Sequence, residues 1–461
     1  MSIHKYLNIN QEKVVKKICK KNVLAVVVIC LLPFVGLKAQ DTLTVSLPKA
    51  LEIAMSKSPT IKVADKEIER VDYSKKEKFA ALFPNISATG SYSRAIKKQK
   101  IFLPFPPFDK GIEMGYDNNY NAGLNALIPV IAPALWTTLK MTELDTQLIL
   151  ESARSSKLTL TNQVTKAYYA ILMAQDSYNV FKHSYDNTVE NARIIKNKYK
   201  QGTVSEFEWI RSDVQVRNAQ SNVVSSESAV NMSILQLKML MGIDMFTAFK
   251  IEGSLADFES TMYGDVLQID TTTLHSNTDL NQFDIRSKQM SQTLKLQKAA
   301  WWPTLSASFN YQYNLLGNDS IGFSKYDHYP TATAGLTLSI PIFQGGARSY
   351  KQKQLQIQID ELKYQRDNLR RGLELQVITC LDNIKKAIQK ISSNKEGLHQ
   401  ALKAVAISQK RYDVGSGTYL DITDSELAYI TAGLSYNQSI FDYLSAKSDL
   451  EKLLGKDSRI K

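Results

Sequence analysis

The residues whose types and spacing could do chemistry stand in the segment YDVGSGTYLDITD, residues 412–424. Two glycines, Gly415 and Gly417, interrupt a long helical pattern, and Asp421 and Asp424 follow as the pattern resumes. Side chains three positions apart lie on one face of a helix, so both carboxylates can point the same way. Grouped carboxylates can attract cations, but acids also stabilise the first turn of a helix without any further role. The spacing alone leaves both interpretations open.

Other patterns that carry chemistry are missing from the sequence. The five histidines show no metal-ligand spacing and no partnered cysteine. There is no P-loop, no G-x-S-x-G and no G-x-G-x-x-G in a strand–helix context. We therefore expect no catalytic centre, no cofactor and no metal site, and we expect that the protein is not an enzyme. No RNA-binding motif or basic stripe is present either, so we expect no nucleic acid partner.

Residues 1–39 are expected to be a secretory signal peptide. Lysines precede the apolar run VLAVVVICLLPFVG at 23–36, which is too short to span a bilayer comfortably, and Leu37-Lys38-Ala39 resembles a cleavage site. Without the seven lysines and one glutamate of this leader, the chain's 57 basic and 45 acidic residues give a net charge of +6 rather than +12. Only Cys380 then remains, so the exported chain can form no internal disulfide.

The rest of the chain repeats one plan. Five anchors recur in the same order, at offsets between 212 and 219 residues. They include the pairs Pro84 and Pro303, Pro129 and Pro341, Gly202 and Gly415, Glu208 and Asp421, and Gly242 and Gly455. We therefore predict two structural repeats, 40–255 and 256–461.

Each repeat is predicted to hold a helical stretch, then two strands, then long helices. Apolar and small polar residues alternate in the strand segments, which are about 85–96 and 116–129 in the first repeat and about 304–315 and 331–343 in the second. Residues 134–201 contain neither glycine nor proline. Heptad spacing runs through this segment and its counterpart in the second repeat, which predicts coiled-coil packing.

Strands with one apolar and one polar face fit either a soluble sandwich or a transmembrane barrel. Export, strand lengths near ten residues, and aromatic residues at strand ends such as Trp301 favour the barrel. Four strands cannot close a barrel, because about eight is the practical minimum, so the barrel would require association. A soluble periplasmic coiled-coil adaptor of a transport complex is the alternative.

Taken in this order, the features resemble the TolC-type outer-membrane efflux family over nearly all of the exported chain. The resemblance rests on the duplication, on the prolines that flank each strand pair, and on the glycines at 202 and 415. It implies a mostly α-helical homotrimer with a 12-stranded β-barrel in outer-membrane lipid and a long periplasmic α-helical barrel. The implied function is the outer-membrane channel component of a tripartite efflux or type I secretion system. Such a channel is a passive exit duct, gated at its periplasmic end, that works with an inner-membrane pump and a periplasmic adaptor protein.

The resemblance also implies a pore constriction. Asp421 and Asp424 match the aspartates that line it in the family, and threefold symmetry would make them two rings of carboxylates. Such rings favour cations, and mutual repulsion raises their pKa. The substrate that passes the constriction is not implied.

A tip latch is the last implied feature. Tyr412 and Glu208 match its tyrosine and its acidic partner, while Gly417 stands where the family has a latch arginine. Arg211, one turn beyond Glu208, is the candidate replacement. Gly202, Gly415 and Gly417 would form the periplasmic turns.

Overall fold

The computed structural model describes residues 43–102, 111–262 and 274–456, so the expected leader lies outside the described residues. The chain forms two compact units. In the smaller unit, β1 (Leu43–Val45) and β6 (Phe249–Ile251) pair in parallel. The larger unit holds residues 46–244 and those from 253 onward, which include most of both sequence repeats.

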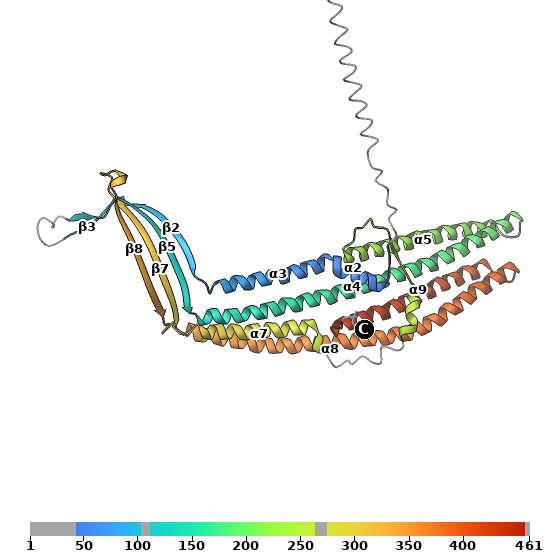
Figure 1. Ribbon diagram of the computed structural model, residues 1–461. Coiled ribbons are helices and arrows are strands. Elements are labelled where there is room, and N and C mark those ends of the chain that lie inside the picture. Colours follow the sequence, from blue (N-terminus) through green and yellow to red (C-terminus); the bar gives the residue numbers. More distant parts are fainter. Residues whose placement is uncertain (1–42, 103–110, 263–273, 457–461) are drawn as a thin grey trace, which may run out of the picture. The chain divides into compact units, whose positions relative to one another are not determined.

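Most of the larger unit is helical (Figure 1). Its α-helices are α2 (Leu47–Lys57), α3 (Pro59–Ala80), α4 (Pro133–Lys200), α5 (Glu206–Met241), α7 (Thr278–Ala299), α8 (Ala347–Asp413) and α9 (Tyr419–Leu453). Short 3₁₀ helices are η2 (Leu255–Thr261), η4 (Leu274–Ser276) and η5 (Phe323–Lys325). Within the described ranges, none of these helices combines the length and the apolar character that a membrane span requires.

Two helical hairpins, α4–α5 and α8–α9, dominate the helical packing. Helix α4 also packs against α3, α7 and α9, so it connects the two hairpins. Its 68 residues, free of glycine, span roughly 100 Å. The heptad pattern explains the burial, because Val377, Ile384 and Ile391 on α8 are seven residues apart and all buried.

The strands form one antiparallel sheet of order β2-β5-β7-β8. Its members are β2 (Asn85–Arg94), β5 (Asn118–Ile131), β7 (Thr304–Gly317) and β8 (Asp327–Ser339). The register places apolar residues beside apolar ones and polar residues beside polar ones across all four strands. One row is Ile86, Ala126, Phe309 and Ala334, and the next row is Ser87, Asn125, Asn310 and Thr333. Since successive residues of a strand face opposite sides, the sheet has one apolar and one polar face.

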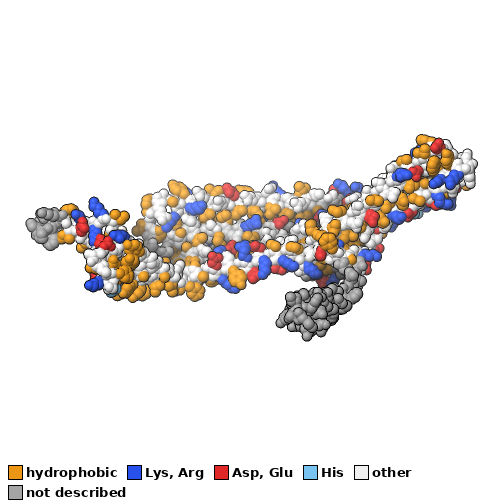
Figure 2. Space-filling view, turned by 90° about the horizontal axis from the view of Figure 1, so that it is seen from above, with side chains coloured by type: hydrophobic (Ala, Val, Ile, Leu, Met, Phe, Trp, Pro, Cys, Tyr) orange, Lys and Arg blue, Asp and Glu red, His pale blue; other side chains and the backbone are white. Residues whose placement is uncertain are grey.

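The apolar face is exposed in the single chain. Phe309 is 48% exposed and Leu336 is 73% exposed, and hydrophobic side chains gather over the strands (Figure 2). A soluble sandwich would cover this face with a second layer.

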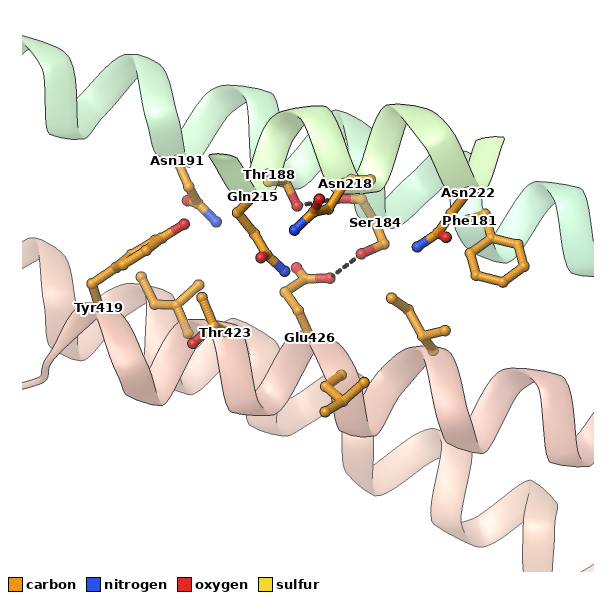
Figure 3. Close-up of a pocket in the computed structure, with 14 residues that line it drawn as sticks. Phe181, Ser184, Thr188, Asn191, Gln215, Asn218, Asn222, Tyr419, Thr423 and Glu426 are labelled. Carbon is orange, nitrogen blue, oxygen red and sulfur yellow. Dashed lines mark hydrogen bonds between the residues drawn. The ribbon is translucent and has the colours of Figure 1, made fainter. Parts of the chain in front are cut away.

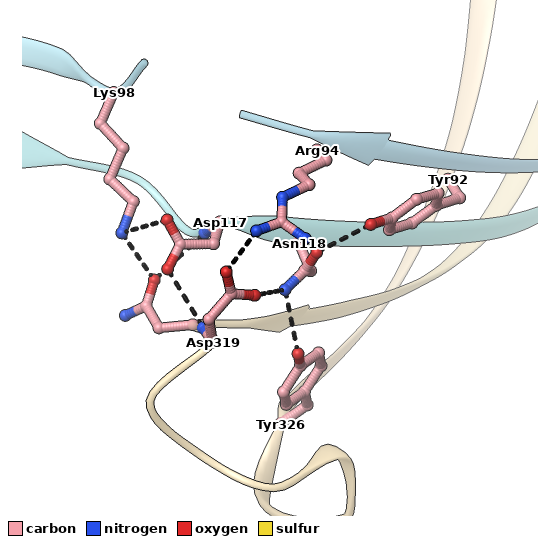
Figure 4. A network of polar contacts seen from close by, with 8 residues as sticks. Tyr92, Arg94, Lys98, Asp117, Asn118, Asp319 and Tyr326 are labelled. Carbon is pink, nitrogen blue, oxygen red and sulfur yellow. Dashed lines mark hydrogen bonds and ion pairs between the residues drawn. The ribbon is translucent and has the colours of Figure 1, made fainter. Parts of the chain in front are cut away.

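The loops beyond the strands hold structure that sequence alternation did not predict. A small hairpin of β3 (Gln99–Ile101) and β4 (Ile112–Met114) lies in the first loop. A polar network then ties the first loop to the loop between β7 and β8 (Figure 4). Lys98 Nζ contacts Asp117 Oδ1 (2.9 Å) and Asn318 Oδ1 (2.8 Å), while Asn118 Nδ2 donates to Asp319 Oδ1 (2.7 Å). The two repeats are therefore joined by side chains as well as by the sheet.

Candidate functional site

The two hairpins turn through the same backbone motif. In the first turn the Gly202 N–H donates to Tyr199 O (2.9 Å) and the Thr203 N–H donates to Lys198 O (3.0 Å). In the second turn, 213 residues later, the Gly415 N–H donates to Tyr412 O (3.2 Å) and the Ser416 N–H donates to Arg411 O (2.8 Å). Each pair is a Schellman motif, which satisfies the last carbonyls of a helix. Gly202 and Gly415 both have φ of 75°, a left-handed conformation that favours glycine. The sequence repeat therefore extends to individual hydrogen bonds.

Gly417 differs from Gly202 and Gly415, because its position is closely packed rather than left-handed. Its backbone lies outside the left-handed region, and its N–H donates to Arg411 O (3.0 Å). A Cβ at this position would stand 3.0 Å from Arg411 Cβ, so any side chain would crowd the end of α8. The departure from the expected arginine thus occurs where space is tight.

Each helix that leaves a turn begins at a hydroxyl cap. The Ser205 side chain accepts the Glu208 N–H on α5 (3.3 Å), and the Thr418 side chain accepts the Asp421 N–H on α9 (3.3 Å). On α9 the cap is reciprocal, because Asp421 Oδ2 accepts the Thr418 N–H (2.9 Å). This hydrogen bond from the Thr418 backbone is the main reason that the Asp421 pKa lies below its ordinary value. Asp421 therefore already stabilises the first turn of α9.

Asp424 lies one turn further along α9 and is exposed. Within the described part of the chain, its carboxylate has no hydrogen bond or ion pair. The two aspartates predicted to act together thus have different surroundings in the single chain.

Four helix ends converge at a hydrophobic cluster beside the turns. We call it the turn cluster; it consists of the buried Ile195, Tyr412, Tyr419 and Ile422, with Val204 and Trp209 packed against them. These residues come from α4, α5, α8, α9 and the first turn. Burial of this apolar surface holds the ends of both hairpins together.

Tyr412, the predicted latch tyrosine, lies in the turn cluster and is 7% exposed. Lys198 Nζ sits 4.2 Å from the centroid of its ring and 3.3 Å from its carbonyl oxygen. The Tyr412 hydroxyl is buried and has no hydrogen-bond partner among the residues that the structure describes. Burial, followed by the negative charge of Glu208, raises the pKa of Tyr412 to about 12. Glu208 therefore acts on Tyr412 electrostatically, and the direct contact comes from Lys198.

Arg211, the candidate replacement for the latch arginine, contacts a different tyrosine. Its guanidinium carbon lies 6.0 Å from the centroid of the Tyr419 ring, at the limit of a cation–π contact. Sequence reasoning named neither Lys198 nor Tyr419. Lys198 could have been found, since it stands 213 residues before the basic Arg411, whereas the counterpart of Tyr419 is the dissimilar Glu206.

Comparison with known proteins decides the family. The sequence profile of the family described as Outer membrane efflux protein matches residues 50–243 and 271–456, which is most of the chain. The chain belongs to the Outer membrane efflux protein family. The Outer membrane protein TolC of Vibrio cholerae is 18% identical over 335 residues, 73% of this chain and 76% of that protein. The Alkaline protease secretion protein AprF of Pseudomonas aeruginosa is 20% identical over 430 residues, 92% of this chain and 87% of that protein.

The fold agrees with solved structures of such channels. The crystal structure of the Campylobacter jejuni CmeC outer membrane channel superposes with a TM-score of 0.70 at 18% identity, covering 89% of this chain and 85% of CmeC. Membership of the Outer membrane efflux protein family confirms the TolC-type resemblance, the outer-membrane location and the role of an outer-membrane channel in efflux or secretion. The soluble adaptor is not supported.

Proposed function

We propose that this outer membrane efflux protein works as a homotrimeric exit duct with a 12-stranded barrel in outer-membrane lipid and a helical barrel across the periplasm. The duct conducts passively, while an inner-membrane pump and a periplasmic adaptor protein supply energy and docking. Both roles, efflux and type I secretion, fit the chain, since AprF is named for protease secretion and the family for efflux.

The sheet is the observation that carries this proposal. Strands β2 and β8 are its edges, and each pairs on one side only. Unpaired strand edges and an exposed apolar face are both costly in water. Closure of three such sheets into one barrel pairs the edges and places the apolar rows against lipid, with the polar rows toward the lumen.

The gate of the proposed duct lies at the two turns. Gly202, Gly415 and Gly417 shape the periplasmic turns, and the turn cluster holds both hairpins together at this end. Asp421 and Asp424 line the constriction, with Asp424 the more available to ions because it is exposed while Asp421 is engaged in the helix cap. The tip latch of Tyr412, Glu208 and Arg211 gains Lys198, whose ammonium lies against the Tyr412 ring.

Oligomeric state and conductance test the proposal together. The protein is extracted from the outer-membrane fraction in mild detergent, and its native mass is measured. We expect three copies per particle and, in planar bilayers, cation-selective conductance. A monomer recovered from the periplasm without detergent, or a trimer that forms no conducting channel, would overturn it.

A further inference from the structure

A buried carboxylate joins the two hairpins about two turns beyond the start of α9. Glu426 is 6% exposed and accepts hydrogen bonds from Ser184 Oγ (2.8 Å) and Asn187 Nδ2 (3.0 Å) of α4. Figure 3 shows Glu426 pointing from α9 toward the first hairpin. Because α4 and α9 belong to different hairpins, this acid is a polar link between the moving parts of the proposed gate.

A cavity of about 110 Å³ lies beside Glu426. Amides and hydroxyls from three helices line it, among them Asn191, Gln215, Asn218, Asn222 and Thr423. Apolar side chains, among them Phe181, Leu427 and Ile430, make up the larger part of its lining. On the turn side it adjoins the turn cluster through Tyr419 and Ile422, and further along α9 the helices pack closely again, where Gly433 meets Val180. The cavity is thus a layer of mixed polar and apolar lining between two apolar contacts.

The protonation state of Glu426 alters the strength of this link. Burial raises the Glu426 pKa above its ordinary value of 4.5, although Ser184, Asn187 and the positive charge of His183 oppose the shift. A protonated Glu426 keeps both contacts, since its hydroxyl can donate to Ser184 and its carbonyl can accept from Asn187. An ionised Glu426 carries a charge that the site solvates poorly.

The neighbouring groups leave Glu426 as the principal titrating acid of this layer. His183 is the basic neighbour on α4, and its ring packs against Tyr429 of α9 with the centroids 5.5 Å apart. Helix α5 presents neutral amides to the cavity. Helix α8 approaches with Ser408, whose hydroxyl lies 2.6 Å from the Ser425 hydroxyl.

We propose that Glu426 is a proton-controlled contact that holds the α4–α5 hairpin against the α8–α9 hairpin when protonated and releases it when ionised. The proposal rests on the exit duct described above and adds a regulatory element to its gate. For an acid whose pKa is raised on folding, the stabilisation is complete below pH 4.5 and is lost as pH rises through the folded-state pKa. Rising pH therefore loosens the hairpins and favours opening.

Hydrogen exchange of the full-length protein in detergent tests the proposal. Protection of the α9 amides near Glu426 is measured from pH 4 to pH 9 and corrected for intrinsic exchange. In the wild type we expect protection to fall with rising pH, roughly tenfold for each unit by which the Glu426 pKa is raised. Glu426→Gln imitates the protonated acid and should keep high protection throughout. His183→Gln removes an attractive charge and should move the wild-type transition to higher pH.

Control variants distinguish an effect of Glu426 protonation from a general effect of substitution. Glu227→Gln changes an exposed glutamate on α5 and should behave as the wild type. If Glu426→Gln does not fold, Ser184→Ala serves instead, because loss of one hydrogen bond to the carboxylate should shift the transition to higher pH. A Glu426→Gln variant with the pH response of the wild type would overturn the proposal. Conductance measured on the same samples reports on the exit duct independently, so either idea can fail alone.

Discussion

At the scale of single residues, Asp421 and Asp424 have different tasks despite their shared helix face. Asp421 completes the cap of α9 with Thr418, which lowers its pKa. The family resemblance predicts the opposite effect, a rise through repulsion between copies. The cap therefore opposes protonation of Asp421, and in the proposed trimer it would act against that rise.

Separate substitutions at the two aspartates should have separate effects. A lowered pKa means that the Asp421 cap stabilises α9 at neutral pH and is lost as pH falls below the ordinary value of 3.8. Protection of the first turn of α9, corrected for intrinsic exchange, should fall in acid for the wild type, while Asp421→Asn should show the lower protection already at neutral pH. Asp424→Asn should leave this exchange unchanged but lower cation selectivity in planar bilayers. Equal effects of both variants on exchange would contradict this division.

At the scale of elements, the sequence predicts the helices and strands that have a regular pattern of apolar residues. Alternation located the four strands of the main sheet within a few residues, because each has one apolar face. Continuity without glycine or proline located α4. Periodicity could not find the β3–β4 hairpin, which is only three residues long on each side, or the contact of Lys198 with Tyr412, which depends on how two hairpins pack.

Replacement of glycine by alanine should lower the stability of the protein at a turn and raise it inside a helix. Gly415→Ala forces a Cβ into a left-handed backbone and should destabilise the protein by about 1–2 kcal/mol. Gly372→Ala lies inside α8, where a Cβ meets nothing within 4 Å, and should stabilise it by up to about 1 kcal/mol. Apparent melting temperatures of the purified variants measure both. A shift in the same direction for the two would show that the turn conformation is not the cause.

At the scale of the whole molecule, the proposed association of copies rests on the matched rows of the sheet. Phe309 and Asn310 are neighbours on the central strand β7, yet they belong to the apolar and the polar row. The same rows continue to both open edges, so a neighbouring sheet can extend each face without interruption. Lipid and lumen are the two surroundings that suit these faces.

A charge placed on either row should therefore distinguish the two surroundings. Phe309→Arg puts a guanidinium on the lipid face, at a cost of about 2–4 kcal/mol near the middle of the membrane, and should reduce the amount of folded protein in the outer-membrane fraction. Asn310→Arg puts the same group on the lumen face, so it should assemble normally and lower cation selectivity. Membrane fractionation and planar-bilayer recordings measure the two outcomes. Normal assembly of Phe309→Arg together with failure of Asn310→Arg would mean that the sheet faces lipid with its polar rows, which would overturn the proposed barrel.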